Sequence, residues 1–410
     1  MPSSTTPSSS AALPAPGSDT AADLRGVSQL IITAVTGVTD IVEDMHRNIA
    51  TPSSLIGRAP AGRTRGITGL VYRSVRGVTK GVGSLLDMAL AQLAPLLPDQ
   101  PFSARREALL AALNGVLGDY LIADQNSLAI PMRLRQNGVP LELTPAALAN
   151  RFGDSDGCLL ILAHGLCMND LQWLRDGHDH GAGLAKEFGY TALYLNYNSG
   201  RHISSNGHEF AATLEQLINA WPVPVRELVI VGHSMGGLIT RSACHYAEEA
   251  GHRWPGVLKK MVFLGSPHHG APLERAGNRA NLLVGISPSS APLTRLGMIR
   301  SSGIRDLRFG NLLDEDWQDQ DEHHKHDPRL SVPLHAGVEC YVVAATKGKQ
   351  PAARLPGDGL VQVHSALGQH RNSALSLPSP ASQQLIVYDT DHFALLSEQR
   401  VFQHLLVWLR

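Results

Sequence analysis

One short run of residues constrains the fold more than any other part of this chain. The apolar run Leu228–Val231 leads into Gly232-His-Ser234-Met-Gly236-Gly237. A serine flanked by glycines two residues away on either side, after a strand and before a helix, is typical of the turn called a nucleophile elbow. Glycine is needed because Cβ atoms would collide in so tight a turn. Ser234 is therefore predicted to project at the end of a buried strand, where the N-terminus of the next helix favours negative charge.

Strand-like and helical runs alternate around this turn. A hairpin is predicted first, because Asn137-Gly138 separates the runs Leu128–Arg135 and Val139–Leu143. The later strands are expected at Cys158–Ala163, Thr191–Leu195, Leu228–Val231, Lys260–Leu264, Glu339–Ala344 and Gln384–Tyr388, and the helices at Ala182–Phe188, Glu209–Ala220, Gly237–Ala250 and Arg400–Leu409. The alternation predicts an α/β fold with a mostly parallel central sheet, covered on both faces and preceded by an antiparallel hairpin.

The chain of 410 residues divides unevenly. Residues 1–22 are rich in Ser, Thr, Pro and Ala and are expected to be a disordered tail. Residues 23–120 show apolar residues at helical spacing and are expected to form an N-terminal amphipathic helical region. Residues 121–410 are expected to form the α/β domain. Within it, residues 271–333 interrupt the alternation, which predicts a helical lid insertion.

Composition and charge restrict the partners. A net charge of −1 argues against a nucleic-acid-binding protein. The first 20 residues lack the basic start and apolar run of an export signal, so a cytoplasmic protein is expected. Six basic and no acidic side chains lie between Arg58 and Lys80, beside an apolar stripe. A helix packed on the α/β domain is the favoured interpretation, and peripheral membrane contact through residues 58–97 is the alternative.

A nucleophilic serine needs a base and an acid that orients the base. His392 is the predicted base, because it lies in the loop between the last strand and the terminal helix. Asp358 is the predicted acid. It lies in the run Gly357-Asp358-Gly359, in the loop that follows the predicted strand Glu339–Ala344. The weaker alternatives are His364, His370 and His404 for the base and Asp389 and Asp391 for the acid.

The loop after the first central strand is the expected oxyanion hole. We predict the backbone N–H groups of Leu166 and Met235 as its donors, with Gly165 admitting close approach of the backbone. The candidate substrate-binding residues are His164, Gly165, Tyr197, His233 and His268. For the segment that contains Tyr197, a purely structural loop is an equally good interpretation. No metal site is predicted, because the histidines between residues 314 and 327 lack an ordered ligand spacing.

Four motifs in this order resemble a known family. The loop His164-Gly165-Leu166, the elbow Gly232–Gly237, the segment Gly357–Val361 and Asp391-His392 are similar to the motifs of the α/β-hydrolase superfamily, in particular its bacterial lipases and esterases. The segment Gly265–Pro272 is also similar to a loop of lipases and of GPI inositol-deacylase-like hydrolases. The resemblance covers about residues 125–410 and implies the α/β-hydrolase fold.

The resemblance implies a serine carboxylic ester hydrolase. Ser234, Asp358 and His392 would form its triad, and it would pass through an acyl-enzyme without a cofactor. The low charged fraction, 17%, favours apolar or lipid-like ester substrates. Two alternatives remain at this point: a membrane-associated interaction protein with an inactive hydrolase domain, and an acyltransferase.

Overall fold

The computed structural model describes residues 104–123, 125–271, 301–318, 329–350 and 355–410. The chain divides into two units, Met1–Asp99 and Gln100–Arg410, and every described residue lies in the second unit. Residues 1–103 lie outside the described residues. They include the expected tail at 1–22 and the candidate membrane contact at 58–97 with its apolar stripe.

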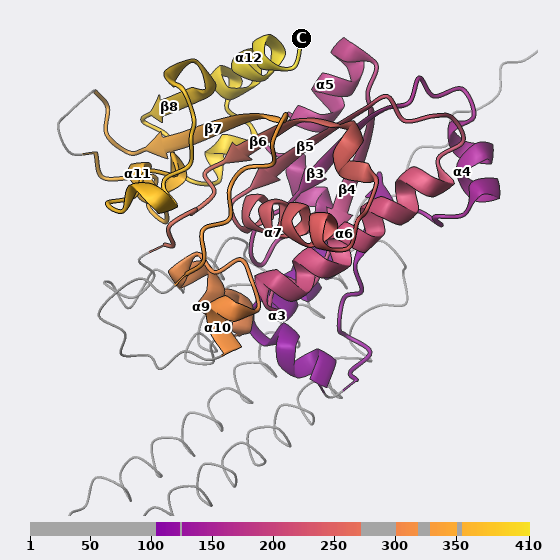
Figure 1. Cartoon of the computed structure of the whole chain (residues 1–410), viewed down its shortest axis with the longest axis horizontal. Helices are drawn as coiled ribbons and strands as arrows, with labels where there is room; N and C mark the ends of the chain where they lie inside the picture. The colour runs from indigo at the N-terminus through magenta and orange to yellow at the C-terminus, as the bar shows by residue number, and fades with distance from the viewer. Residues whose placement is uncertain (1–103, 124, 272–300, 319–328, 351–354) are drawn as a thin grey trace, which may run out of the picture. The chain divides into compact units, whose positions relative to one another are not determined.

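A mixed sheet of eight strands forms the centre of this unit (Figure 1). Its spatial order is β2-β1-β4-β3-β5-β6-β7-β8. The strands are β1 Arg133–Gln136, β2 Val139–Pro140, β3 Cys158–Ala163, β4 Thr191–Asn196, β5 Glu227–His233, β6 Leu258–Leu264, β7 Glu339–Thr346 and β8 Gln384–Tyr388. Strand β1 pairs antiparallel with β2 and β4, and all other pairs are parallel. The predicted mostly parallel sheet with an antiparallel first hairpin is confirmed.

The hairpin turn has the predicted chemistry. Asn137 and Gly138 both adopt positive φ, at 54° and 76°. Two consecutive residues with positive φ make the two-residue turn whose twist matches that of the flanking strands. The strands themselves are shorter than the apolar runs suggested, since β1 begins at Arg133.

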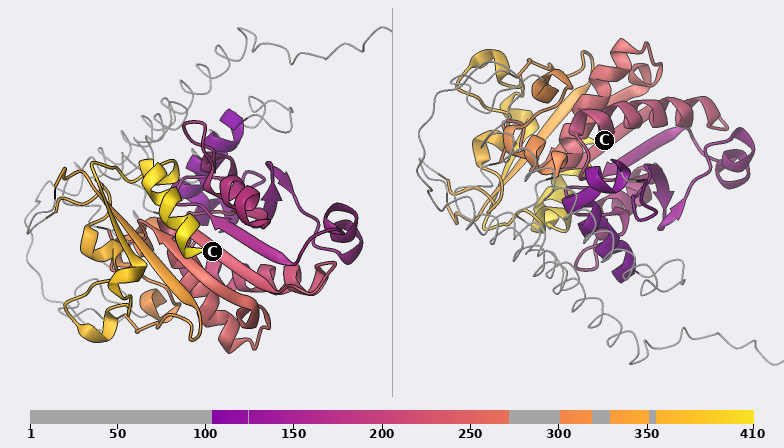
Figure 2. Two further views of the ribbon diagram at one scale, coloured as in Figure 1. Left: turned by 90° about the horizontal axis from the view of Figure 1, so that it is seen from above. Right: turned by 90° about the horizontal axis from the view of Figure 1, so that it is seen from below.

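Helices cover both faces of the sheet, as Figure 2 shows. Helices α6 and α7 pack together on one face, and α5 and α12 pack together on the other (Figures 1 and 2). The helices of the described residues are α3 Ala104–Ala123, α4 Pro145–Phe152, α5 His180–Phe188, α6 Ile203–Ala220, α7 Met235–Glu249, α9 Ser302–Phe309, α10 Glu315–Gln318, α11 Val363–Ala366 and α12 Gln399–Trp408. This double cover explains why β3 and β5 are continuous apolar runs, since a strand buried on both faces has no polar side.

Helix α3 belongs to the compact unit that begins at Gln100. The expected division between residues 120 and 121 therefore differs from the observed one. The Asn114 side chain donates to Leu128 O at 2.8 Å and accepts from Ile130 N at 2.9 Å, and Asn198 donates to the carbonyl of Gly118 at 3.0 Å. Buried residues lie on several sides of α3, which is the pattern of a helix enclosed by protein.

The insertion between β6 and β7 contains helices α9 and α10. Helix α9 lies against α3, because Ser302 N donates to the Asp119 carboxylate at 2.9 Å. It also lies against the loop after β4, because Gly303 N donates to Gly200 O at 3.0 Å. Residues 272–300 and 319–328 of the insertion lie outside the described residues, so its role as a lid stays a prediction. Among the helices that the structure describes, none is both long and apolar enough to cross a membrane.

Candidate active site

Ser234 lies in a strained turn between β5 and α7. Its backbone has φ 54° and ψ −121°, a conformation that is uncommon for a residue with a side chain. The two neighbouring glycines are required by sterics. A Cβ atom on Gly232 would lie 2.5 Å from Gly237 N, and one on Gly236 would lie 2.2 Å from Ala163 O. The Ser234 N–H donates to Leu264 O at 2.9 Å, which ties the turn to the end of β6.

His392 and Asp358 form a buried pair beside this turn. The Nδ1 atom of His392 lies 2.7 Å from Asp358 Oδ2, and the two side chains are 2% and 1% exposed. The other carboxylate oxygen of Asp358 accepts the N–H groups of Leu360 and Val361 at 2.8 and 2.7 Å. A backbone hydrogen bond also joins the two residues, since His392 N donates to Asp358 O at 3.2 Å. Because a carboxylate only accepts, Nδ1 carries the proton and Nε2 is left as a base.

The alternative acids and bases lie elsewhere. Asp391 accepts the N–H groups of Phe393 and Ala394 at 3.0 and 2.9 Å, so it caps the short turn that follows. His364 and His404 are exposed, and His404 Nδ1 lies 2.9 Å from Arg400 O within α12. The structure thus brings Asp358, and not its rivals, onto the ring of His392.

His233 connects the serine turn to the His392 loop. Its Nε2 atom donates to the carbonyl of His392 at 3.1 Å, and the two rings are 4.8 Å apart. Two glycines allow the close approach: a Cβ atom on Gly165 would lie 3.1 Å from Ser234 Cβ, and one on Gly265 would lie 3.2 Å from His392 Nδ1. Within the described residues Ser234 Oγ makes no hydrogen bond. Catalytic serine–histidine contacts are often long until substrate binds.

Two backbone amides beside Ser234 have no acceptor among the residues that the structure describes. In the part of the chain that the structure describes, neither Leu166 N–H nor Met235 N–H donates a hydrogen bond. The neighbouring amides are occupied, since Cys167 N donates to Ser199 Oγ at 3.0 Å and Met168 N donates to Gly165 O at 3.3 Å. Unfilled donors at a strand end and at a helix N-terminus are what an oxyanion hole requires.

The strand order, the antiparallel hairpin at one edge and the strained serine between β5 and α7 together decide the architecture. The unit Gln100–Arg410 has the α/β-hydrolase fold. Within it, residues 181–343 match the family model described as the PGAP1-like alpha/beta domain. This match agrees with the resemblance to inositol-deacylase-like hydrolases noted from the sequence. No curated protein matches the chain.

Several solved structures are similar to the chain in fold. The mature form of lipase BlEst2 of Bacillus licheniformis is 19% identical, with a TM-score of 0.40, and the match covers 62% of this chain and 91% of that one. The hyperthermophilic esterase of the archaeon Pyrobaculum calidifontis is 12% identical, with a TM-score of 0.38, and the match covers 78% and 95%. Lipase B of Aspergillus fumigatus is 13% identical, with a TM-score of 0.34 and coverage of 60% and 51%.

In this α/β-hydrolase fold, Tyr197 packs against His164, the first residue of the predicted oxyanion loop. Both are buried, at 1% and 0% exposed. Their rings stack with centroids 4.3 Å apart, and Tyr197 donates its hydroxyl to His164 O at 2.8 Å. Burial lowers the pKa of His164 to about 4, so the ring is neutral at neutral pH. As placed, Tyr197 supports the loop that begins at His164, as His233 supports the His392 loop.

The segment after β4, which contains Tyr197, makes the contacts of a structural loop. Ser199 accepts the Cys167 N–H, and Asn198 accepts the N–H of Gly200 at 3.0 Å. Cys167 has φ 59°, so its contact with Ser199 holds the loop after β3 in an uncommon conformation. Sequence reasoning singled out this segment but missed Ser199 as the residue that holds the loop.

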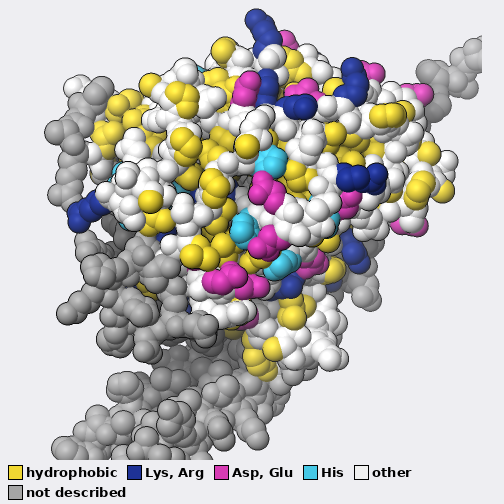
Figure 3. Space-filling model, in the orientation of Figure 1, with side chains coloured by type: hydrophobic (Ala, Val, Ile, Leu, Met, Phe, Trp, Pro, Cys, Tyr) yellow, Lys and Arg dark blue, Asp and Glu magenta, His cyan; other side chains and the backbone are white. Residues whose placement is uncertain are grey.

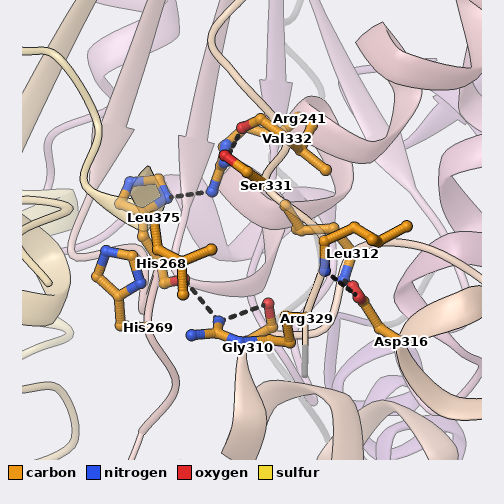
Figure 4. A pocket seen from close by; sticks show the side chains of 11 residues that line it. Arg241, His268, His269, Gly310, Leu312, Asp316, Arg329, Ser331, Val332 and Leu375 are labelled. Atoms are coloured by element: carbon orange, nitrogen blue, oxygen red, sulfur yellow. Dashed lines mark hydrogen bonds between the residues drawn. The ribbon is translucent and has the colours of Figure 1, made fainter. Parts of the chain in front are cut away.

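His268, the fifth predicted substrate-binding residue, lines a separate small cavity together with Arg241 (Figure 4). Its Nδ1 atom lies 3.4 Å from an Nη atom of Arg241. Arg241 carries no sequence signal of this contact, because it lies on the second turn of helix α7 among apolar and small residues.

Histidine side chains on the face drawn in Figure 3 lie among acidic ones. His208 lies 3.4 Å from Asp314, and His245 lies 3.3 Å from Glu249 one turn along α7. In the described ranges, no three or more His, Cys, Asp or Glu side chains are arranged to hold a metal ion. Residues 319–327 of the histidine-rich run lie outside those ranges.

Proposed function

We propose that this protein is a serine carboxylic ester hydrolase. The observation that carries the proposal is the strained backbone of Ser234, which presents a serine at the N-terminus of α7 beside the buried His392–Asp358 pair. Such strain in a residue with a side chain persists only where the surroundings enforce it, and it is concentrated at functional sites. A structural serine would not need this conformation.

The proposed reaction begins with transfer of the Ser234 Oγ proton to His392 Nε2. As that bond breaks, Oγ attacks the ester carbonyl carbon, and the carbonyl oxygen becomes an oxyanion that accepts the N–H groups of Leu166 and Met235. Asp358 stabilises the resulting imidazolium through the 2.7 Å contact with Nδ1. The alcohol then leaves with the proton from His392, and Ser234 carries the acyl group as an ester.

In the second half of the proposed reaction, water hydrolyses the acyl-enzyme. His392 removes a proton from water, and the hydroxide oxygen attacks the acyl carbon. The second oxyanion uses the same two amides. Collapse releases the carboxylic acid and returns the proton to Ser234. Each step therefore uses only groups of this chain and water.

An apolar or lipid-like acyl group is the proposed substrate class. The charged fraction of the chain is low, at 17%, and the loops around Ser234 carry Leu166, Met168 and Trp173 as buried apolar side chains. Apolar walls with a few placed polar groups are the usual composition of small-molecule sites.

The test is hydrolysis of a p-nitrophenyl ester series, from acetate to laurate, by the wild type and by Ser234→Ala. We expect turnover by the wild type to rise with chain length and to fall roughly 10⁶-fold in the variant. Ser242→Ala is the matched control, because Ser242 is a buried serine of the same helix whose hydroxyl donates to Leu312 O at 2.7 Å. Its turnover is expected to stay within a few fold.

Equal turnover by the wild type and Ser234→Ala would contradict the assignment. Transfer of the acyl group to added glycerol in preference to water would show an acyltransferase instead. Absence of turnover on every ester, in a folded wild-type protein, would favour the inactive interaction domain.

A further inference from the structure

The middle of helix α3 is enclosed by protein, although the helix precedes the alternating strands and helices of the sheet. Every residue from Leu110 to Gly118 is buried. This stretch makes more than two turns at 3.6 residues per turn, so all sides of the helix are covered. A helix on the surface of a domain would leave a polar stripe in solvent. The contacts of α3 therefore belong to the interior of the unit.

One of these contacts is with the loop after β3. A Cβ atom on Gly115 would lie 2.3 Å from the Sγ atom of Cys167, 2.9 Å from its Cα and 3.0 Å from its N. Non-bonded heavy atoms pack at about 3.5–4.0 Å, so only a glycine lets the helix backbone come this close to the loop backbone. The Cys167 thiol also donates to Ala112 O at 3.9 Å. Cys167 directly follows Leu166, the predicted oxyanion donor.

The far end of the same loop is joined to α3 by charge. Arg135 of β1 donates to Glu107 Oε2 of α3 at 2.7 Å and to Asp170 Oδ1 at 3.1 Å. Asp170 begins the short 3₁₀ helix that ends the loop. The three side chains are at most 13% exposed, so water and salt screen these ion pairs only weakly. Helix α3 thus holds the loop at Cys167 and again at Asp170.

Helix α3 is itself fixed where it contacts Cys167. The carbonyl of Gly115 accepts the hydroxyl of Ser301 at 2.7 Å. One turn further along, Asn198 donates to the carbonyl of Gly118 at 3.0 Å. The helix backbone is therefore bonded to two other segments, and it cannot withdraw from Cys167 without breaking these hydrogen bonds.

We propose that Gly115 is a positioning residue for the oxyanion hole. Its close approach fixes Cys167, and because a planar peptide joins the two residues, a shift of Cys167 moves Leu166 with it. An oxyanion donor acts only when it is aimed at the place where the charge develops. Gly115 touches no substrate and acts through Cys167. The proposal rests on the proposed ester hydrolysis, in which the Leu166 N–H donates to the oxyanion.

The first test is Gly115→Ala in the full chain. We expect kcat for p-nitrophenyl esters to fall roughly 10- to 100-fold, because a displacement of about 1 Å can cost 10²-fold. KM should stay within a few fold, because the oxyanion exists only in the transition state. Gly256→Ala is the matched control, since a Cβ atom there would meet no described atom within 4 Å. Wild-type kcat in folded Gly115→Ala would overturn the proposal and leave the proposed hydrolysis standing.

The second test asks whether the effect passes through Cys167. Cys167→Ala removes the Sγ atom that lies nearest to the added methyl group. The double variant Gly115→Ala/Cys167→Ala should therefore recover part of the kcat that Gly115→Ala loses. Such a recovery is a departure from additivity, as expected for residues in contact. A merely structural role predicts additive losses of stability, and a double variant no faster than Gly115→Ala would contradict the steric route.

The third test does not depend on activity. In crystal structures, Leu166 N should be displaced relative to Ser234 Oγ in Gly115→Ala, and an unmoved Leu166 would overturn the positioning. If the wild type hydrolyses no ester and Leu166 still moves, the proposed function has failed and the contact stands.

If Gly115→Ala does not fold, native-state hydrogen exchange of the wild type decides. The amides of Cys167 and Met168 should open with the same free energy as the centre of α3. Exchange of these two amides through a smaller opening would overturn the proposal.

Discussion

His392 and His268 are two buried histidines with opposite chemistry. They are 2% and 1% exposed, and each follows a strand of the same sheet, β8 and β6. The Nδ1 atom of His392 faces the carboxylate of Asp358, so its Nε2 is a free base. The Nδ1 atom of His268 faces the guanidinium of Arg241, so its Nε2 is a donor.

The difference teaches that burial by itself does not give a histidine its role. The charge of the group at Nδ1 selects the tautomer, and the tautomer decides whether the outer nitrogen can remove a proton. A carboxylate at Nδ1 leaves Nε2 able to accept a proton, whereas a cation at Nδ1 leaves Nε2 as a neutral donor. The two loops therefore hold their histidines in different tautomers, although their sequences, Asp391-His392 and Pro267-His268, are equally short signals.

The largest effect is expected from a substitution that gives His392 the tautomer of His268, with the ring proton on Nε2. In Asp358→Asn, the amide oxygen should take the place that accepts the N–H groups of Leu360 and Val361. The amide NH₂ would then face Nδ1 and donate to it, which moves the ring proton to Nε2. We expect kcat to fall roughly 10⁴-fold with the protein still folded, as measured by ester hydrolysis and circular dichroism.

Asp391→Asn is the matched control for that change. Asp391 is exposed and accepts two backbone N–H groups, which an asparagine oxygen can do as well. Its kcat is expected to stay within a few fold. A loss in Asp391→Asn as large as that in Asp358→Asn would mean that the His392 loop, and not the tautomer, was disturbed.

A smaller effect, on the pH dependence of stability, is expected from His180, a buried histidine that is neutral at neutral pH. His180 accepts from His178 Nε2 at 2.8 Å, donates to Leu395 O at 2.9 Å, and has its pKa lowered by burial to about 4. The unfolded chain takes up a proton near pH 6.5 that the folded chain excludes until about pH 4. This contribution to stability is therefore complete above pH 6.5 and is lost as the pH falls toward 4.

The change to make is His180→Gln, which retains a donor for Leu395 O and removes the titrating ring. Between pH 7 and pH 5 the wild type should lose about 2 kcal/mol more of its free energy of unfolding than the variant does, as measured in urea. His404→Gln is the control, because His404 is exposed on α12. A pH dependence that is the same in all three proteins would show that His180 does not exclude the proton.

The parts of the fold that rest on local patterns were predictable from the sequence. Cys158–Ala163 and Gln384–Tyr388 form strands with the bounds expected, because each contains a run of apolar residues between turn residues. The Ser234 turn followed from its glycines, and the structure shows the backbone contacts that exclude a side chain there. The pair of His392 with Asp358 could be proposed because both follow strands that end at one edge of the sheet.

The features that the sequence did not reveal depend on tertiary contacts. The sequence grouped helix α3 with the helical region 23–120, because nothing local marks its attachment to the sheet unit, which runs through Asn114 and Gly118. The contact of Arg241 with His268 joins residues 27 positions apart. The support of Cys167 by Ser199 joins residues 32 positions apart. No local spacing marks such pairs.

Labelling with a fluorophosphonate, followed by peptide mass spectrometry, tests the assignment of Ser234 as nucleophile most directly. The reagent phosphonylates only a serine that is activated as a nucleophile. We predict one label per chain on the peptide that contains Ser234, its loss in Ser234→Ala, and strongly reduced labelling in Asp358→Asn. No label on the folded wild type, or a label on another serine that persists in Ser234→Ala, would contradict the account.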